Sequence, residues 1–364
     1  MVTTIQSPHA DRCSLSARMP SIPSNRRRQG IQQLRWLTLG GVRQAIHIAG
    51  EDLDLPVLLF LHGGPGLPHM PFAHVNQELM ESFIVVNWDQ RGAGKSYSPR
   101  LQGSELTIAQ MESDTCELID WLCDFLHKTS VILVGHSWGS LLGLTIAARY
   151  PSRVHAYVGI GQVTNLRAAE RLRFEIATRL ARETRNATAC RSLDELGAPP
   201  YRSEQQSELL ENWSCRLCGD CAQPLKTAHF FQTALNSPLY SWLDLLRIPL
   251  GACCSQRWLW PQVFETANLA CTVPRLEIPV LFLTGRRDVV TNHALASQYF
   301  QALQAPAGKR FVTFDAGHWP HLEQPALFRS ALLQGLGASP RGAIAPSRGP
   351  ATQFNEASSL LNAA

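Results

Sequence analysis

The chain has 364 residues, of which 45% are hydrophobic and 17% are charged, and its net charge is +4. This composition suits one large or two modest globular domains with a substantial core. No apolar run approaches the ~20 residues of a bilayer-spanning helix, so we expect no membrane partner. Residues 1–35 contain six arginines and one aspartate, a charge of +5, which leaves the remaining chain near −1. The folded part therefore has no basic surplus for nucleic acid.

Both ends of the chain have the composition of disordered segments. Residues 1–33 are rich in Ser, Pro and Arg and lack the hydrophobic stretch of a secretory signal, so we expect a disordered leader. The protein is then cytoplasmic, or organellar if the Arg- and Ser-rich leader is a transit peptide. Residues 338–364, rich in Ser, Pro, Gly, Ala and Asn, are expected to form a disordered tail.

The first predicted elements are a β-hairpin and a buried strand. Residues 34–39 and 42–48 alternate in polarity on either side of Gly40-Gly41, which is typical of an antiparallel hairpin. Residues 56–61 form an aliphatic run, which predicts a strand buried on both faces. It ends in His62-Gly63-Gly64-Pro65-Gly66. A loop so rich in glycine can point backbone N–H groups into a cavity, as an oxyanion hole requires.

The middle of the chain predicts a sharp turn from a strand into a helix. After a strand at 83–88 and a helix at 107–127, residues 131–134 are four consecutive aliphatic residues, and 140–149 favour a helix. Gly135-x-Ser137-x-Gly139 lies between them. Flanking glycines remove the Cβ atoms that would clash in so tight a turn. We predict a nucleophile elbow that exposes the Ser137 hydroxyl at a helix N-terminus.

Two later strands deliver the residue types that a serine nucleophile needs. Residues 154–160 predict another strand, and the sheet resumes at 279–284, followed by Asp288. A last strand at 310–314 is followed by His318. Side chains that follow the carboxyl ends of strands gather at one edge of an open α/β sheet. The chain order Ser, Asp, His is the one expected of a catalytic triad in this class.

The alternation of strands and helices predicts an α/β fold with a mostly parallel sheet covered on both faces. Its core would comprise 34–164 and 275–337. Residues 165–274 differ: 166–182 predict a confident helix, and the rest mixes aromatic residues with helical segments. We interpret this insertion as a helical cap over the site.

Cysteines in the cap have the spacing of metal ligands. Cys215-x-x-Cys218-x-x-Cys221 invites a metal hypothesis, with Cys190, Cys253 or Cys254 as a fourth ligand. No second pair of this kind accompanies it, so unpaired thiols are the favoured interpretation. We expect no metal and no cofactor.

Three motifs together resemble the α/β-hydrolase fold in its proline iminopeptidase branch, peptidase family S33. They are His62-Gly63-Gly64-Pro65-Gly66, Asp89-Gln90-Arg91-Gly92-x-Gly94-x-Ser96 and Gly135-x-Ser137-Trp138-Gly139-Ser140. The resemblance implies Ser137 as nucleophile, His318 as general base and Asp288 as the group that orients the imidazole. It also implies an oxyanion hole from the N–H groups of Gly64 and Trp138. As rivals, Asp315, His321, Glu323 and His136 are expected to be structural.

The chain departs from the family in the cap. The family carries a Trp-x-x-Trp-Glu stretch whose acid holds the free amino end of the substrate, whereas this chain has Trp258-Leu259-Trp260-Pro261. Substrate-binding candidates are Glu170, Glu175, Glu265 and Trp258, and further acids that could serve are Glu204, Glu208 and Glu211. Each glutamate alone is more often a solvated helix charge.

Two substrate classes therefore stay open. One is the N-terminal residue of a short peptide, as the resemblance implies; the other is an ester, lactone or thioester of a small metabolite, favoured by the missing acid and the aromatic cap. A ligand-binding protein on an inactive hydrolase scaffold is a third hypothesis. The sequence says nothing of the oligomeric state.

Overall fold

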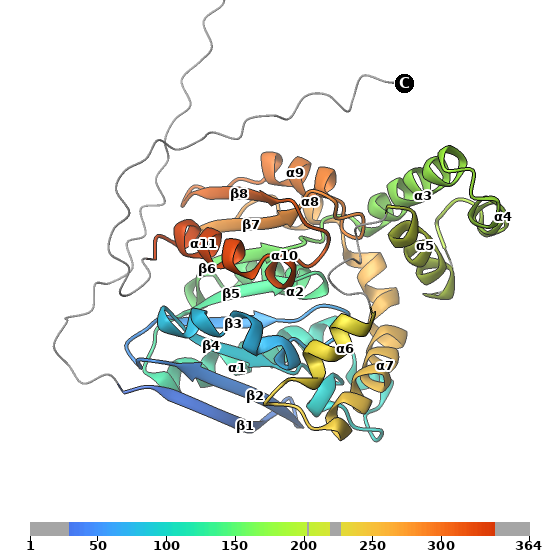
Figure 1. Cartoon of the computed structure of the whole chain (residues 1–364). Coiled ribbons are helices and arrows are strands. Elements are labelled where there is room, and N and C mark those ends of the chain that lie inside the picture. Colours follow the sequence, from blue (N-terminus) through green and yellow to red (C-terminus); the bar gives the residue numbers. More distant parts are fainter. Residues whose placement is uncertain (1–28, 202–203, 219–226, 339–364) are drawn as a thin grey trace, which may run out of the picture.

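The computed structural model describes residues 29–201, 204–218 and 227–338. Within them one sheet of eight strands runs in the order β1-β2-β4-β3-β5-β6-β7-β8 (Figure 1). The strands are β1 (Ile31–Leu39), β2 (Val42–Gly50), β3 (Val57–Leu61), β4 (Ile84–Trp88), β5 (Val131–His136), β6 (Val154–Ile160), β7 (Val280–Gly285) and β8 (Lys309–Phe314). The predicted α/β fold is confirmed.

The sheet is parallel from β4 to β8 and antiparallel at the β1–β2 edge. Strands β3, β4, β5 and β7 are buried along their whole length, which explains the apolar runs with which they begin. The predicted leader of 1–33 is wrong at its end, because β1 already begins at Ile31, which pairs with Gly50. An edge strand needs only backbone pairing there, and its polar side chains gave no signal. Residues 1–28 and 339–364 lie outside the described part.

Two layers of helices cover the sheet, and each has its own apolar core. On one face lie α1 (Ile108–Leu126), α2 (Trp138–Arg149) and α9 (His293–Ala302); on the other lie η1 (Met70–Glu81), α10 (Pro320–Glu323) and α11 (Pro325–Leu336). Three short 3-10 turns lie in the loops of the sheet domain: η2 (Gly94–Ser96), η3 (Gly103–Glu105) and η4 (Pro151–Arg153).

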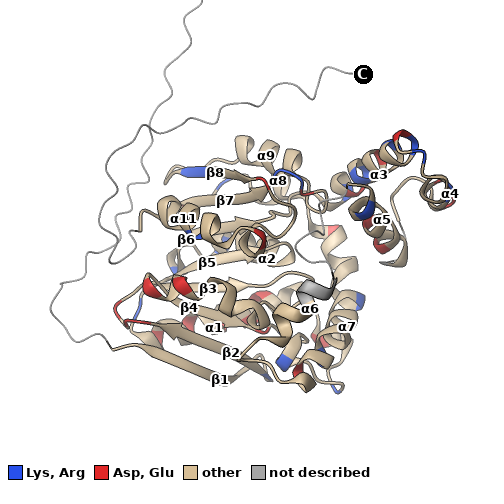
Figure 2. Ribbon diagram, in the orientation of Figure 1, with Lys and Arg blue, Asp and Glu red and all other residues tan. Residues whose placement is uncertain are grey.

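Helices inserted between β6 and β7 form the cap. They are α3 (Leu166–Glu183), α4 (Ala187–Leu196), α5 (Glu204–Leu217), α6 (Thr227–Leu235), α7 (Trp242–Thr266) and α8 (Leu269–Thr272). Figure 1 shows α3, α5 and α7 beyond the ends of the parallel strands. Charges of both signs lie on α3 and α5, whereas the central strands carry almost none (Figure 2).

None of the helices in the described ranges combines the length and the apolar character that crossing a bilayer requires.

Candidate active site

Ser137 occupies a strained turn between β5 and α2. Its backbone has φ 52° and ψ −119°, a conformation that costs a non-glycine residue energy and is found where the surroundings enforce it. A Cβ on Gly135 would lie 2.3 Å from the carbonyl oxygen of Gly139, and a Cβ on Gly139 would lie 2.1 Å from that of Leu61. Both flanking glycines are therefore sterically required, and the serine is held half-buried at the N-terminus of α2.

Asp288 and His318, which follow β7 and β8, meet at the same edge of the sheet. The Nδ1–H of His318 donates to Oδ2 of Asp288 at 2.9 Å, and both side chains are buried. The other Asp288 oxygen accepts the backbone N–H groups of Val290 (2.8 Å) and Thr291 (3.0 Å). A Cβ on Gly161 would lie 3.0 Å from the imidazole, so the backbone packs closely against this pair.

Electrostatics keep Asp288 ionised and favour the protonated form of His318 beside it. Burial alone would raise the pKa of Asp288, but the charge of His318 and the hydrogen bonds from His318 and Thr291 outweigh it and hold that pKa well below its usual range. Burial lowers the pKa of His318, yet the Asp288 carboxylate outweighs burial and raises it above 6.5. The Nδ1 atom is thus fixed as a donor to Asp288, which leaves Nε2 to face the pocket.

Gln90 connects the glycine-rich loop with the elbow. The side chain of Gln90 donates to the His62 carbonyl at 3.3 Å and accepts from the indole N–H of Trp138 at 3.1 Å. Its backbone N–H donates to Nε2 of His62 at 3.1 Å. Gly64, at φ +112°, could not carry a side chain because a Cβ would lie 2.6 Å from the Gly66 nitrogen. The backbone of Trp138 is the first turn of α2, where N–H groups have no partner within the helix.

The rival residues have structural surroundings. Asp315 is 74% exposed and pairs with Arg287, away from His318. Glu323 accepts the N–H groups of Gly317 (2.7 Å) and Trp319 (3.1 Å) and so fixes the loop on both sides of His318. His136 donates from Nε2 to the carbonyl oxygen of His318 at 3.1 Å. His321 is buried with its ring 4.8 Å from that of His136, and burial holds the pKa of both rings well below 6.5.

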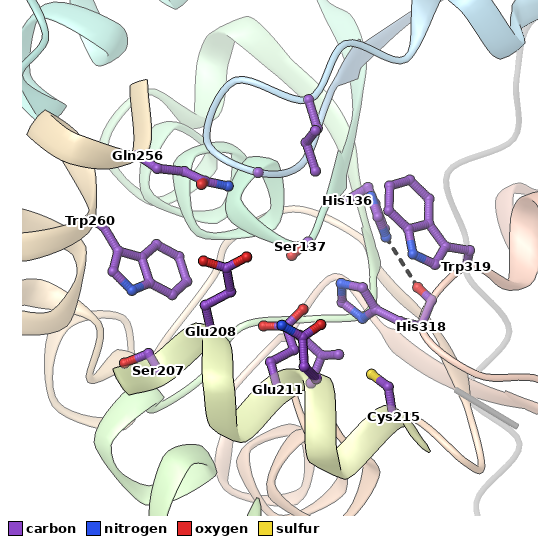
Figure 3. Close-up of a pocket in the computed structure, with 14 residues that line it drawn as sticks. His136, Ser137, Ser207, Glu208, Glu211, Cys215, Gln256, Trp260, His318 and Trp319 are labelled. Carbon is purple, nitrogen blue, oxygen red and sulfur yellow. Dashed lines mark hydrogen bonds between the residues drawn. The ribbon is translucent and has the colours of Figure 1, made fainter. Parts of the chain in front are cut away.

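A pocket of about 390 Å³ lies between the sheet and the cap. This is within the usual range for a small-molecule site. Ser137 and His318 line its floor, with the imidazole directed toward the serine (Figure 3). Glu208 and Glu211 point into it from α5, and Trp260 forms a wall from α7 (Figure 3). Its other described lining residues are Gly64, Leu67, His136, Ser207, Asn212, Cys215, Gln256, Val290 and Trp319.

The four cap candidates singled out from the sequence do not belong to the described lining of this pocket. Glu175 and Glu265 are exposed. Trp258 is 46% exposed and packs over Gly103 on the outside of the cap. Glu170 is buried and accepts the Ser207 hydroxyl at 2.6 Å, one residue layer behind the lining. The structure thus brings none of the four into this lining, because the direction in which each helix face points depends on how the cap packs. Their part in substrate binding stays a prediction.

Glu208 and Glu211 are the acids that the cap places in the pocket. In the sequence they are two of several cap acids that could serve, although their spacing of three residues puts them on one face of α5. Glu204 precedes them on this helix, but its side chain lies outside the described part. Trp260, two residues beyond Trp258, lines the pocket, whereas Trp258 does not belong to the described lining. The i, i+3 pair was the available signal for an acidic helix face.

A metal site finds no geometric support among the residues that the structure describes, since no three ligand-type side chains gather there. Cys215 lies on α5 and lines the pocket, and Cys218 directly follows the end of that helix at Leu217. Cys221, the third member of the motif, falls outside the described ranges, so the motif as a whole stays a prediction.

The fold and this arrangement define a class of protein. The model of the alpha/beta hydrolase fold family matches residues 56–325, which is most of the chain. The chain therefore belongs to the α/β-hydrolase fold family, and the resemblance seen in its motifs is confirmed. It is a hydrolase.

Among proteins of known sequence, the chain is 31% identical over 319 residues to a probable aminopeptidase, YbaC, of Bacillus subtilis, covering 84% of this chain and 96% of that protein. Among solved structures, it resembles a proline iminopeptidase-related protein from Thermus thermophilus, with a TM-score of 0.58, 20% identity and coverage of 84% of this chain and 98% of the other. An epoxide hydrolase mutant from Bacillus megaterium is similar in fold, with a TM-score of 0.56, 20% identity and coverage of 83% of this chain and 100% of the other.

Proposed function

We propose that the protein is a serine hydrolase in which Ser137, His318 and Asp288 form a catalytic triad. The observation that carries the proposal is the buried hydrogen bond between His318 and Asp288, directed at a serine in a strained elbow. All three residues follow strand ends at one edge of the sheet, and Ser137 and His318 line one pocket. The side chain at the elbow is a serine, whereas an epoxide hydrolase of this fold uses an aspartate.

The proposed reaction is acyl transfer to water. Oγ of Ser137 attacks the substrate carbonyl carbon while Nε2 of His318 takes the hydroxyl proton. The imidazolium that forms is stabilised by Asp288, and the negative oxygen is held by the backbone N–H groups of Gly64 and Trp138. Each such donor is worth up to ~3–4 kcal/mol in comparable sites. His318 then protonates the leaving group, which departs and leaves the acyl group on Ser137. In the second half, Nε2 of His318 takes a proton from water as the water attacks the acyl carbon, and it returns that proton to Oγ of Ser137 as the acid is released.

The substrate that fits best is a short peptide with a free amino end. Glu208 and Glu211 face Ser137 across the pocket, and a pair of carboxylates suits an ammonium group held beside the scissile bond. The similarity to a probable aminopeptidase over 84% of the chain supports this choice. Glu208 and Glu211 would thus serve in place of the acid that is missing after Trp260.

A carboxylesterase acting on a small metabolite is the second candidate. The aromatic walls formed by Trp260 and Trp319 favour it, because they suit an apolar acyl group without a charge. Both candidates share the triad and differ in the role of the two glutamates.

The test compares hydrolysis of proline β-naphthylamide with that of p-nitrophenyl acetate and butyrate. Ser137→Ala should lower turnover of every substrate by a factor of about 10⁴ or more, whereas Ser330→Ala, on the exposed side of α11, should match the wild type. A fluorophosphonate should label Ser137 alone, which peptide mass spectrometry would locate.

The substrates decide between the two candidates. Cleavage of the prolyl amide supports the aminopeptidase, and ester turnover without amide turnover supports the carboxylesterase. Turnover that survives Ser137→Ala, or a chain that neither reacts with the label nor turns over any substrate, would overturn the triad.

A further inference from the structure

A buried arginine of the cap reaches the loop that carries Asp288. Arg173 lies on α3, and its side chain is only 8% exposed. Its Nε donates to the carbonyl oxygen of Val289 at 3.2 Å and its Nη2 to that of Val290 at 2.5 Å. These are the two residues that directly follow Asp288. One guanidinium fork thus holds two consecutive carbonyl groups.

The same two peptide units are held on their other side by Asp288 itself. The Val289 carbonyl shares its peptide bond with the N–H of Val290, and the Val290 carbonyl shares its peptide bond with the N–H of Thr291. Both N–H groups donate to Oδ1 of Asp288, at 2.8 and 3.0 Å. Two peptide units therefore lie between a guanidinium cation and the carboxylate. Each polarises the peptide groups in the sense that strengthens the opposite hydrogen bond.

The stability of the fold does not explain why a buried arginine occupies position 173. A buried charge costs free energy unless a close opposite charge compensates it, and apolar residues often serve the fold better. The carboxylate partner of Arg173 is Glu211, at 3.4 Å, and its side chain is 46% exposed. Glu211 in turn lines the pocket, as does Val290. The arginine is thus placed where the cap, the pocket wall and the Asp288 loop meet.

We propose that Arg173 is a positioning residue that fixes Asp288 through two peptide groups and so aligns the Asp288–His318 pair when the cap is in place. The inference rests on the proposed triad. It gives the cap a part in catalysis besides substrate binding, because the side chain of Arg173 on α3 holds the loop that follows Asp288. The ion pair with Glu211 extends this connection to the substrate pocket.

Arg173 also contributes charge near the proposed base. The groups that act on the charge of His318 are the carboxylates of Asp288, Glu211 and Glu323, the cation Arg173, and the neutral rings of His136 and His321. The pKa of His318 is raised by Asp288 and Glu211 and lowered by Arg173. Removing Arg173 should therefore raise that pKa further, and removing the charge of Glu211 should lower it.

The test uses Arg173→Met, Arg173→Lys and Glu211→Gln, with the neutral ester p-nitrophenyl acetate so that no substrate amine titrates. Arg179→Met is the control, since Arg179 lies on the same helix with a side chain 67% exposed.

Arg173→Met should lower kcat by about tenfold or more at nearly constant KM, in line with the cost of small misalignments in other enzymes. The acidic limb of its pH–rate profile, which reports the pKa of His318, should move to higher pH, while the acidic limb of Glu211→Gln should move to lower pH. Arg173→Lys should keep the limb and recover only part of kcat, because an ammonium lacks the planar fork.

Proton NMR of the free protein gives a readout that needs no turnover. The His318 Nδ1–H resonance reports its hydrogen bond to Asp288, and we expect it to shift upfield in Arg173→Met but not in Arg179→Met. If Arg173→Met does not fold, Arg173→Lys must still show the kcat loss and a smaller shift. Wild-type kcat, pH profile and resonance in a folded Arg173 variant would overturn the proposal. Ester turnover that persists in Ser137→Ala would instead overturn the triad, and the NMR comparison would still decide the role of Arg173.

Discussion

The two walls of the pocket are built in different ways. On the sheet wall, Asp288 and His318 are buried and joined at 2.9 Å, and the backbone of Gly161 packs closely against them. On the cap wall, Glu208 is exposed, and Glu211 is about half-exposed with its cation 3.4 Å away. Strand ends fix the first wall, while side chains of packed helices form the second.

This difference separates chemistry from selectivity. A hydrogen-bonded, water-excluded pair gives a proton-transfer geometry that hardly depends on the substrate. Half-exposed carboxylates on a helix interact more weakly, because solvent screens them, and they can be exchanged without disturbing the sheet. Variants of the sheet wall should therefore affect all substrates alike, whereas variants of Glu208 on the cap wall should affect substrates selectively. Glu211 is the exception on the cap wall, because it pairs with Arg173 and also acts on the charge of His318.

The largest effect is expected at Asp288. Asp288→Asn should keep the fold but lower kcat by about 10⁴-fold for amide and ester substrates alike, because an amide favours the wrong imidazole tautomer. Steady-state kinetics with both substrates would measure this. Asp315→Asn, in the exposed pair with Arg287, is the matched control and should retain wild-type kcat. If the loss of kcat in Asp288→Asn depended strongly on the substrate, the sheet wall would contribute to selectivity as well as to the chemistry.

An intermediate effect is expected at Glu208. Glu208→Gln should lower kcat/KM for proline β-naphthylamide by about 100-fold, the size of a lost charge-assisted hydrogen bond, and leave p-nitrophenyl acetate almost unchanged. Glu175→Gln, on the exposed side of α3, should change neither value. Equal losses for both substrates would show that Glu208 supports the chemistry itself and not the recognition of an amine.

The smallest effect concerns the stability of the sheet domain against acid, through two histidines buried beside the sheet. Burial lowers the pKa of His62 and of His69 to about 4. Their unfolded-state pKa is about 6.5, so the unfolded chain takes up these protons first as the pH falls. The stabilisation is complete above pH 6.5 and is lost between 6.5 and 4. Between pH 7 and 5 each histidine should account for about 2 kcal/mol of lost unfolding free energy.

Urea unfolding at several pH values would measure this dependence. His69→Gln should remove one histidine's share of it, and His127→Asn, at an exposed left-handed position after α1, should leave it intact. An unfolding free energy that stays constant from pH 7 to 5 would show that the buried rings are protonated in the folded state.

The sheet could be predicted closely from the sequence. The apolar runs at 131–134 and 280–283 fall on β5 and β7, because a strand buried on both faces must be largely apolar. The strand predicted at 310–314 falls on β8, although most of that strand is half-buried or exposed. Thr107 and His127 bracket α1 as its N-cap and C-cap. Gly135 and Gly139 are required in this turn, since a side chain at either position would collide with backbone.

The cap could be predicted only as helical. A pattern of charges along α3, α5 and α7 does not say which face meets the core, since these faces are decided by packing between helices far apart in sequence. Trp258 and Trp260 show the limit: two residues apart on α7, one packs outside over Gly103 and the other lines the pocket.

The strands, the elbow and the order of Ser137, Asp288 and His318 could be read from the amino-acid sequence, because local sterics and strand burial act on neighbouring residues. The contact of Gln90 with Trp138, the contact of Arg173 with the Asp288 loop, and the direction of Glu208 and Glu211 toward the serine follow from packing between distant segments. Each of these contacts joins segments separated by tens of residues, and no local rule fixes the geometry between them.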